Sequence, residues 1–413
     1  MLIEIHMIQN HSPSNLNRDD LGAPKTCIFG GVTRARISSQ CLKRSIRRSQ
    51  EFSAALEKAG GIRTRRLANL LARIAVAGDL DLTPNKMMEL FGATSTANED
   101  IKKLDAIAAK ALELGGVKPK KKGEEVDAEA LSKMLLFLST STITKMARDL
   151  RETNEAKELA MKFREYIAEN PLVPDIALNG RMTEVIKNSV FSELNFTVEA
   201  ALSAADALST HAVVNEVDYF TAADDVPGQD AGAAHVNEAM FNSACFYKYF
   251  AIDFEQLKKN LADDEELACK TVRSFLKAAA NAYPSGKQHG HAAFNPPDGV
   301  LVEVKTQSAT PVSYSNAFAD PVPEKSERGL IGESIARLGQ YAHDLTVGYG
   351  IDAERFWFSP NLRYRLTWID KNKKDPEQEQ SVVGSDEFGE LDQLVNRVMD
   401  MLKATGTPAE AEK

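Results

Sequence analysis

The sequence of 413 residues has few cysteines, and their spacing argues against covalent or metal support of the fold. The cysteines lie far apart and form no Cys-x-x-Cys pair: Cys27, Cys41, Cys245 and Cys269. This pattern is typical of reduced thiols, with neither a disulfide framework nor a zinc site. The chain also lacks an apolar run of transmembrane length, and residues 1–6 lack the basic region and cleavage site of a signal peptide. We therefore expect a cytoplasmic protein.

Motifs of several common enzyme classes are missing as well. No Walker A, Gly-x-Ser-x-Gly or His-Glu-x-x-His pattern occurs. His289 and His291 have no evident third partner, so they are a weak metal signal. Asp19 and Asp20 could in principle hold Mg²⁺, but adjacent acids in a loop are more typical of turns and caps. We expect no catalytic residue, no metal and no cofactor.

Charge is unevenly distributed along the chain. The composition is that of an ordinary soluble protein, 43% hydrophobic and 26% charged, with a formal net charge of −9. Residues 1–50 nevertheless hold eight Lys or Arg and three Asp or Glu, a balance of +5 that leaves −14 for the remainder. A basic segment on an acidic body indicates a specific anionic ligand rather than unspecific adhesion to nucleic acid.

The basic segment contains a short predicted helix. Ser38 or Ser39 is a suitable N-cap, and Leu42 and Ile46 share one stripe of a helix that we expect to continue to about residue 58. The opposite side carries polar and basic side chains: Gln40, Lys43, Arg44, Arg47 and Arg48. Open amide groups at the helix start and the cationic side behind them would both suit phosphates.

The alternative interpretation of this helix is an ordinary solvated surface, which is the usual fate of a run of charges. Two observations favour a polyanion site. Arg34 and Arg36 lie just before the helix, and no acid lies between Asp20 and Glu51.

Strand and helix patterns elsewhere predict an α+β fold. We expect strands at 2–9, 213–221, 241–254 and 300–304, and helices at 197–210, 264–282, 328–346 and 388–404. Residues 11–33 are predicted to be a loop, and residues 62–170 an almost entirely helical lobe. Without that lobe the order is strand, helix, strand, strand, helix, strand, which is typical of ferredoxin-like folds and RNA-recognition domains.

Two of these strands, 213–221 and 241–254, are joined by a long loop and predict an arm that projects from the body. Tyr219 and Phe220 are neighbours on the first of them and therefore point to opposite faces. We expect one ring in the core and the other available to stack on a base, with packing alone as the alternative.

Several segments together resemble a known family. They are residues 15–20, 29–31, 36–40, 43–44, 175–178, 180–182, 218–222, 287–288 and 293–296. Their residues are similar to those of CasC, the backbone subunit of type I-E CRISPR surveillance complexes (Cascade). The N-terminal block is long and specific, and the likeness extends over most of the chain.

The resemblance implies a fold compared to a right hand, with a ferredoxin-like (RRM-like) palm, a large helical fingers insertion and a β-hairpin thumb. The implied domains are a palm at 1–58, 183–211 and 242–403, fingers at 59–182, a thumb at 212–241, and a disordered tail at 404–413.

The resemblance also implies a function, that of a non-catalytic scaffold whose copies stack head to tail in a helical filament along a CRISPR guide RNA. Each thumb would displace a nucleotide, leaving the bases between free to pair with target DNA in antiviral defence. The implied partners are the guide RNA, the paired target DNA, further copies of the chain, and the large, small and guide-end-capping subunits of Cascade. No membrane is implied.

Site residues follow from the same resemblance. The family positions that hold the guide backbone match Lys25, Ser38, Gln40, Lys43 and Arg47, with Lys287 as a further contact. Met182 matches a residue that wedges beside the displaced nucleotide, and the thumb segment matches Tyr219, Phe220 and Thr221. The full predicted RNA-binding set is Arg18, Lys25, Ser38, Gln40, Lys43, Arg44, Arg47, Met182, Tyr219, Phe220, Thr221 and Lys287.

Two alternative functions stay open at this point. One is a metal-dependent ribonuclease that cuts target RNA with Asp19 or Asp20, as backbone subunits of related type III complexes do with an acid in an early loop. The other is an RNA-recognition module that acts alone.

Overall fold

The chain forms two compact units in the computed structural model. One unit comprises residues 1–52, 203–254 and 272–413, and the other comprises residues 53–202 and 255–271. The structure describes all residues except 57–59, 79–81, 94–97, 119–131, 133–134, 170–172, 183–188, 195–196, 222–235, 308–309, 324, 371–378 and 407–413. Among the described residues, no helix is both long enough and apolar enough to cross a membrane.

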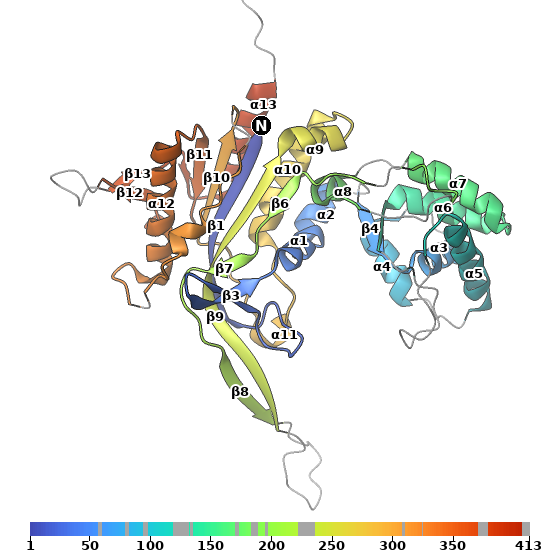
Figure 1. The fold of residues 1–413 in the computed structure, drawn as a ribbon, viewed down its shortest axis with the longest axis horizontal. Helices are drawn as coiled ribbons and strands as arrows, with labels where there is room; N and C mark the ends of the chain where they lie inside the picture. The colour runs from blue at the N-terminus through green and yellow to red at the C-terminus, as the bar shows by residue number, and fades with distance from the viewer. Residues whose placement is uncertain are drawn as a thin grey trace, which may run out of the picture. The chain divides into compact units, whose positions relative to one another are not determined.

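A mixed sheet lies at the centre of the first unit (Figure 1). Its strands, as far as the chain is described, follow the order β14-β11-β10-β1-β9-β7-β3-β2, and β6 and β8 also pair with β9. Their bounds are β1 Leu2–Ser14, β2 Thr26–Phe29, β3 Val32–Ile37, β6 Leu202–Ala204, β7 Ala207–Ser209, β8 Glu216–Thr221, β9 Val236–Asp253, β10 Gly299–Lys305, β11 Glu354–Phe358 and β14 Glu387–Phe388. β11 and β14 run parallel, whereas β1 is antiparallel to both of its neighbours.

Helices cover both faces of this sheet (Figure 1). One face packs against α12, and the opposite face carries α1 and α10. Side chains of β1 alternate between the two faces, so Ile8 joins Leu338 of α12 in one core, while Ile5 pairs with Phe250, which contacts Phe275 of α10. The bounds are α1 Ser39–Arg47, α2 Gln50–Leu56, α9 Phe254–Asn260, α10 Glu265–Asn281, α11 Gln288–His291, a 3₁₀ helix at Ser315–Phe318, α12 Gly329–Tyr349 and α13 Leu391–Gly406. A small hairpin joins β12 (Thr367–Ile369) to β13 (Glu379–Ser381).

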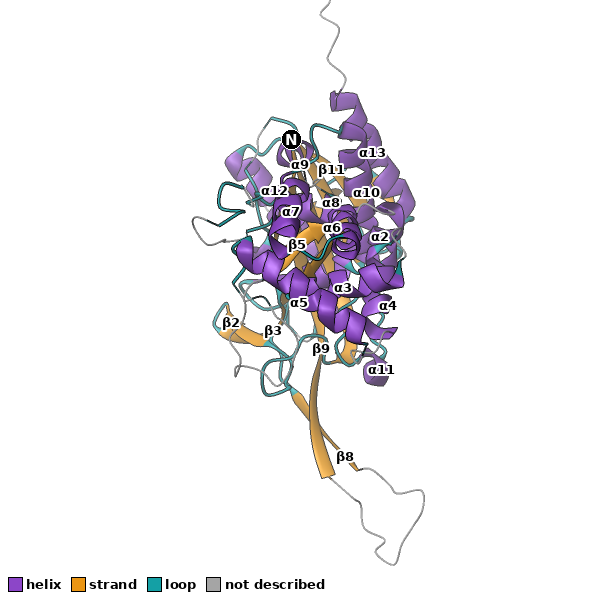
Figure 2. Ribbon diagram, turned by 90° about the vertical axis from the view of Figure 1, so that its right-hand side faces the viewer, coloured by secondary structure: helices purple, strands orange, loops and turns teal. Residues whose placement is uncertain are grey.

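The predicted arm is the hairpin of β8 and β9, and β9 runs without a break from the sheet into it (Figure 2). Residues 242–253 of β9 pair with β1, and residues 236–241 pair with β8. One continuous strand therefore anchors the arm in the core. The predicted loop at its tip lies, for residues 222–235, outside the described residues.

The second unit is mainly helical, as predicted for residues 62–170. Its elements are β4 Gly61–Thr64, α3 Leu67–Ala77, α4 Pro84–Ala93, α5 Glu99–Leu114, β5 Leu136–Ser139, α6 Thr140–Glu152, α7 Ala156–Ala168 and α8 Pro174–Asn179. Side chains of α3, α6 and α7 share one apolar core that includes Leu71, Ile143 and Phe163. Residues 62–64 and 136–139 were expected to be helical, but they pair as strands and are held by long-range backbone hydrogen bonds.

Two further predictions of secondary structure are wrong. Residues 197–210 contain the strands β6 and β7 instead of a helix, because β9 offers its backbone to them and this pairing overrides the helix preference of an alanine-rich segment. The predicted loop 11–33 contains the end of β1 and the β2–β3 hairpin. Gly30 and Gly31, at φ values of 60° and 77°, supply the left-handed turn that such a hairpin needs.

Candidate nucleic-acid interface

The predicted basic helix forms as α1, but it is shorter than expected. Ser38 is its N-cap, and its Oγ accepts a hydrogen bond from the backbone amide three residues later at 3.3 Å. Leu42 and Ile46 are buried, as predicted. The helix ends before Ser49, not near residue 58, because the Ser49 hydroxyl accepts a backbone hydrogen bond at 3.2 Å that caps a second helix, α2.

The start of α1 is less open to phosphate than the sequence suggested. Asp206 Oδ1 accepts a hydrogen bond from the Ser39 amide at 2.8 Å, and its Oδ2 pairs with Arg36 Nη1 at 2.6 Å. Asn17 Oδ1 accepts a further bond from the Ser38 amide at 2.9 Å. Burial alone would raise the pKa of Asp206, but the bonds from Ser39 and Arg36 outweigh it and lower that pKa. The carboxylate therefore stays charged and neutralises Arg36.

Arg34, the other arginine ahead of the helix, is wholly buried. Its guanidinium donates to four backbone carbonyl oxygens at 2.7–3.2 Å, those of Phe29, Ser209, Phe318 and Ala319. It therefore joins the β2–β3 hairpin to the end of β7 and to the segment 318–319, and its guanidinium is not available to a ligand.

The outer side of α1 keeps its predicted polar character. Gln40 and Arg44 are exposed, while Lys43 and Arg47 are half-buried. Burial lowers the pKa of Lys43, because an environment with less water disfavours its charged form.

Other cations lie around the first turn of α1. Burial raises the pKa of the Cys41 thiol there, and the charges of Arg44, Lys248 and Lys25 oppose that rise. Three positive side chains from α1, β9 and the 15–25 loop are therefore close enough to act on one thiol.

The 15–25 loop is fixed against both α1 and the hairpin. The Lys25 amide donates to Asn17 O at 2.8 Å, and Asn17 is the residue whose side chain bonds the start of α1. The side-chain amide of Asn15 donates to Gly22 O and to Met240 O of β9, both at 2.9 Å. Arg18 is exposed on this loop.

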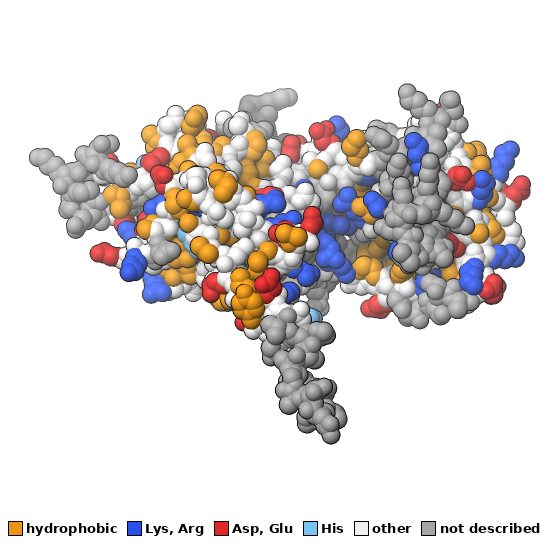
Figure 3. All heavy atoms as spheres, turned by 60° about the horizontal axis from the view of Figure 1, so that its bottom comes forward, with side chains coloured by type: hydrophobic (Ala, Val, Ile, Leu, Met, Phe, Trp, Pro, Cys, Tyr) orange, Lys and Arg blue, Asp and Glu red, His pale blue; other side chains and the backbone are white. Residues whose placement is uncertain are grey.

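Lys287 lies next to the same loop. It is exposed and adopts a left-handed conformation, with φ 46° and ψ 27°, just before α11. The preceding Gly286 packs so closely that a Cβ there would lie 2.3 Å from Leu16 O and 2.7 Å from Asn15 O. The structure thus brings Lys287 to the loop that carries Arg18 and Lys25. Lys and Arg side chains gather on the side from which the hairpin projects (Figure 3).

The aromatic residues of the arm differ from the prediction. Tyr219 is 69% exposed and Phe220 is 47% exposed, so neither ring belongs to a core. The cause is that, in the part of the chain that the structure describes, β8 pairs with β9 alone and lies outside the layers of the central sheet and its helices (Figure 2). Thr221 pairs through its backbone with Val236 at the end of the described part of the arm.

Met182, the predicted wedge residue, belongs to the second unit. It is 79% exposed, directly after a short bridge between Arg181 and Val198.

The candidate metal-binding acids take part in a turn. Asp19 Oδ1 accepts hydrogen bonds from the Leu21 and Ala23 amides, both at 2.9 Å, while Asp20 is exposed. In the part of the chain that the structure describes, no group of three or more His, Cys, Asp or Glu side chains could hold a metal ion, and this includes the surroundings of His289 and His291.

One buried lysine in the middle of β9, Lys248, was not predicted from the sequence. Its Nζ donates to the Gln9 side chain, and burial lowers its pKa to about 8. The neighbouring His11 is also buried, and burial together with the Lys248 charge lowers its pKa to about 3. A lysine within the otherwise apolar and aromatic residues 244–252 of this strand was the signal that could have revealed the cluster.

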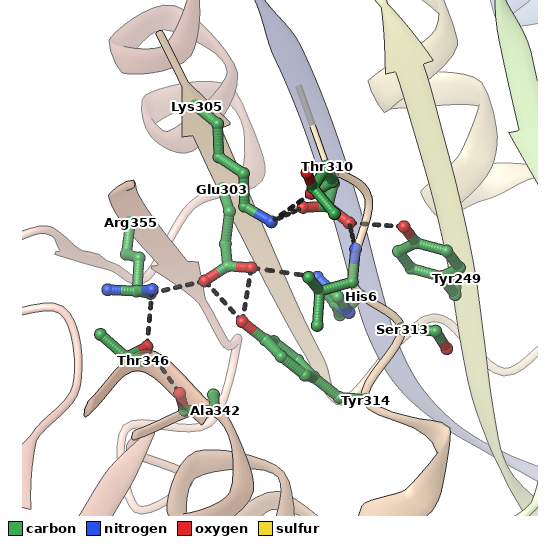
Figure 4. A network of polar contacts seen from close by, with 12 residues as sticks. His6, Tyr249, Glu303, Lys305, Thr310, Ser313, Tyr314, Ala342, Thr346 and Arg355 are labelled. Carbon is green, nitrogen blue, oxygen red and sulfur yellow. Dashed lines mark hydrogen bonds and ion pairs between the residues drawn. The ribbon is translucent and has the colours of Figure 1, made fainter. Parts of the chain in front are cut away.

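A second group of charges is buried under α12 (Figure 4). Glu303 pairs with Arg355 Nε at 2.5 Å and with His6 Nε2 at 3.3 Å, and it accepts hydrogen bonds from Tyr314 at 2.8 and 3.0 Å. Glu4 pairs with Lys305 in the same layer. These carboxylates are wholly buried, so the group stabilises the fold and is not accessible to a substrate.

Comparisons with known proteins place the chain in a family and show similar folds. The sequence profile of the family described as CT1975-like protein matches residues 3–396. One similar solved structure, a CRISPR RNA-guided surveillance complex, pre-nicking, is 28% identical with a TM-score of 0.74 over 97% of this chain and 100% of its own. Another, a CRISPR RNA-guided surveillance complex, has the same coverage, a TM-score of 0.64 and 22% identity, and shows likeness of fold alone. No curated protein matches the chain.

Proposed function

This chain belongs to the family of CT1975-like proteins, and on that basis we propose that it is a guide-RNA-binding subunit of a CRISPR RNA-guided surveillance complex. In more detail, we propose a CasC-type backbone subunit of type I-E Cascade. Several copies would stack head to tail on one guide RNA, together with the large, small and guide-end-capping subunits. The likeness to a subunit of such a complex along almost the whole chain supports this proposal.

Several features of the fold support the proposed palm, fingers and thumb. In the sheet, β10, β1, β9 and β7 are neighbours in that order, with α1 between β1 and β7 in sequence and α10 between β9 and β10. This order supports a ferredoxin-like palm. The helical unit would be the fingers and the β8–β9 hairpin the thumb, with the domain boundaries given above.

The observation that carries the proposal is the cationic surface built by α1, the 15–25 loop and the segment before α11. Among the described residues, no carboxylate pairs with Arg18, Lys25, Arg44 or Lys287. Unpaired cations on adjoining rigid segments suit a chain of phosphates. If each subunit neutralises about four phosphates, the logarithm of RNA affinity should fall with that of salt concentration with a slope of about −3.

Such a surface would hold the sugar-phosphate backbone and leave the base edges open. Sequence reading would then pass to base pairing with target DNA, as in other RNA-guided systems. We also propose that the subunit is not catalytic. The engagement of Asp19 in a turn supports this, and assembled complex incubated with Mg²⁺ and complementary RNA should leave that RNA intact.

The decisive experiment reverses charge on α1. In the variant Lys43→Glu with Arg47→Glu, RNA-dependent assembly, followed by size-exclusion chromatography and the 260/280 nm ratio, should be abolished. The control Lys102→Glu with Lys110→Glu makes the same change of charge on exposed helix α5 and should assemble normally. Unchanged assembly of the α1 variant, or purified complex without RNA, would refute the proposal.

A further inference from the structure

Aromatic rings lie on the surface beside α11, outside the predicted RNA-binding set. Phe294 is 57% exposed and contacts Tyr283 in a T-shaped pair with ring centroids 5.7 Å apart. Next to them, His291 contacts Phe241 of β9, with centroids 6.0 Å apart. The rings connect the segment of Lys287 to the base of the hairpin.

The loop holds Phe294 rigidly although the ring itself is exposed. On one side, the buried Gln288 donates to the carbonyls of Pro284 at 3.0 Å and Ala293 at 3.4 Å. On the other side, Asn295 Oδ1 accepts two hydrogen bonds from Ser12 at 3.1 Å each, and its carbonyl accepts one from Gln9 at 2.5 Å.

An exposed ring between two fixed neighbours loses little freedom when a ligand contacts it. A single exposed aromatic residue needs no explanation by itself. A preformed group of rings beside unpaired cations is different, because it combines the two features that bind single-stranded nucleic acid.

We propose that Phe294 is a stacking platform for an unpaired base of the bound RNA, in addition to the thumb residues. Lys287, just before α11, and His289, within α11, are both exposed, and the phosphates flanking the base would lie toward them. The base itself would meet the neutral ring. This inference rests on the function proposed above.

The test measures binding of fluorescent single-stranded oligouridine RNA to the full-length chain freed of nucleic acid by high salt. Phe294→Ala should weaken binding about five- to twentyfold, as expected for one stacked base. An abasic oligomer with the same phosphates should bind the parent and the variant equally. The salt slope should not change, because no phosphate contact is lost.

Two matched variants separate stacking from loss of apolar surface. Phe294→Tyr keeps an aromatic face and should bind the RNA about as tightly as the parent chain does. Leu362→Ala removes an even more exposed apolar side chain, 82% exposed, from another part of the same unit and should have no effect.

Equal losses on intact and abasic RNA, or no loss on either, would overturn the stacking site while leaving the proposed function standing. The same holds if Phe294→Ala impairs only association with partner proteins. If the parent chain binds no RNA, the proposed function fails and this site falls with it.

Discussion

The two faces of the central sheet differ in whether their charged side chains are paired within the protein. Under α12, Glu303 and Glu4 are buried and each meets a cation at short range. On the side of α1, Arg44 and Lys25 have no carboxylate partner among the described residues. Buried charges must be compensated within the protein, whereas solvated cations can stay available for a ligand. The comparison indicates that the first group serves stability and that the second remains available for the RNA binding proposed above.

Removing one carboxylate from the buried group should have the largest effect. Glu303→Gln leaves the buried Arg355 without its compensating charge, and we expect the free energy of unfolding to fall by about 3–5 kcal/mol. Urea denaturation at neutral pH measures this loss. The control Glu379→Gln breaks a half-exposed pair with Arg328 and should cost about 0–1 kcal/mol. Equal losses in both variants would remove the distinction between buried and exposed pairs.

Acid should weaken the same group. Burial alone would raise the pKa of Glu303, but the hydrogen bond and charge of His6 and the charge of Arg355 outweigh it and lower that pKa to about 2. Because this value lies below the ordinary 4.5, the stabilisation is complete above pH 4.5 and is lost as pH falls toward 2. The full loss is worth about 3 kcal/mol.

Thermal unfolding between pH 6 and pH 3 checks this prediction. The difference in stability between the parent and Glu303→Gln should shrink as pH falls, because the parent loses the charge that the variant already lacks. A constant difference across this range would contradict the assigned pairing.

Removing a cation from the face that carries α1 should have little effect on stability. We expect Arg44→Gln to alter the free energy of unfolding by no more than about 0.5 kcal/mol, since the side chain is exposed. The salt slope of RNA binding should become shallower by about 0.7, which corresponds to one lost phosphate contact. Binding titrations at several salt concentrations, compared with Arg363→Gln on the far side of the sheet, test this. If the parent, Arg44→Gln and Arg363→Gln all show the same salt slope, Arg44 makes no phosphate contact and the proposed difference between the two faces is wrong.

Local patterns predicted much of the fold. The Ser38 cap and the buried Leu42 and Ile46 follow from capping chemistry and helical periodicity, and the structure confirms them. The strands of the arm and helices α10 and α12 were also predicted near their observed positions. The β6 and β7 strands were missed because short alanine-rich segments have weak preferences of their own.

The candidate site was predictable to a smaller extent. The sequence shows where the cations cluster along the chain, but it does not show which of them remain available to bind a ligand. Arg34 and Arg36 look equivalent to Arg44, yet the first is bound by carbonyls and the second by Asp206. The open ring of Phe294 has no local signature either, because its exposure depends on how neighbouring segments pack.

The order of the amino acids alone determined that a capped helix with one apolar and one cationic side forms near the N-terminus, since capping and periodicity act within a few residues. The tertiary structure decided which cations remain available. Asp206 lies 170 residues from Arg36, and only folding of the sheet brings its carboxylate to the start of the helix. Electrostatic pairing acts over a few ångströms in space, and distance along the chain does not reveal it.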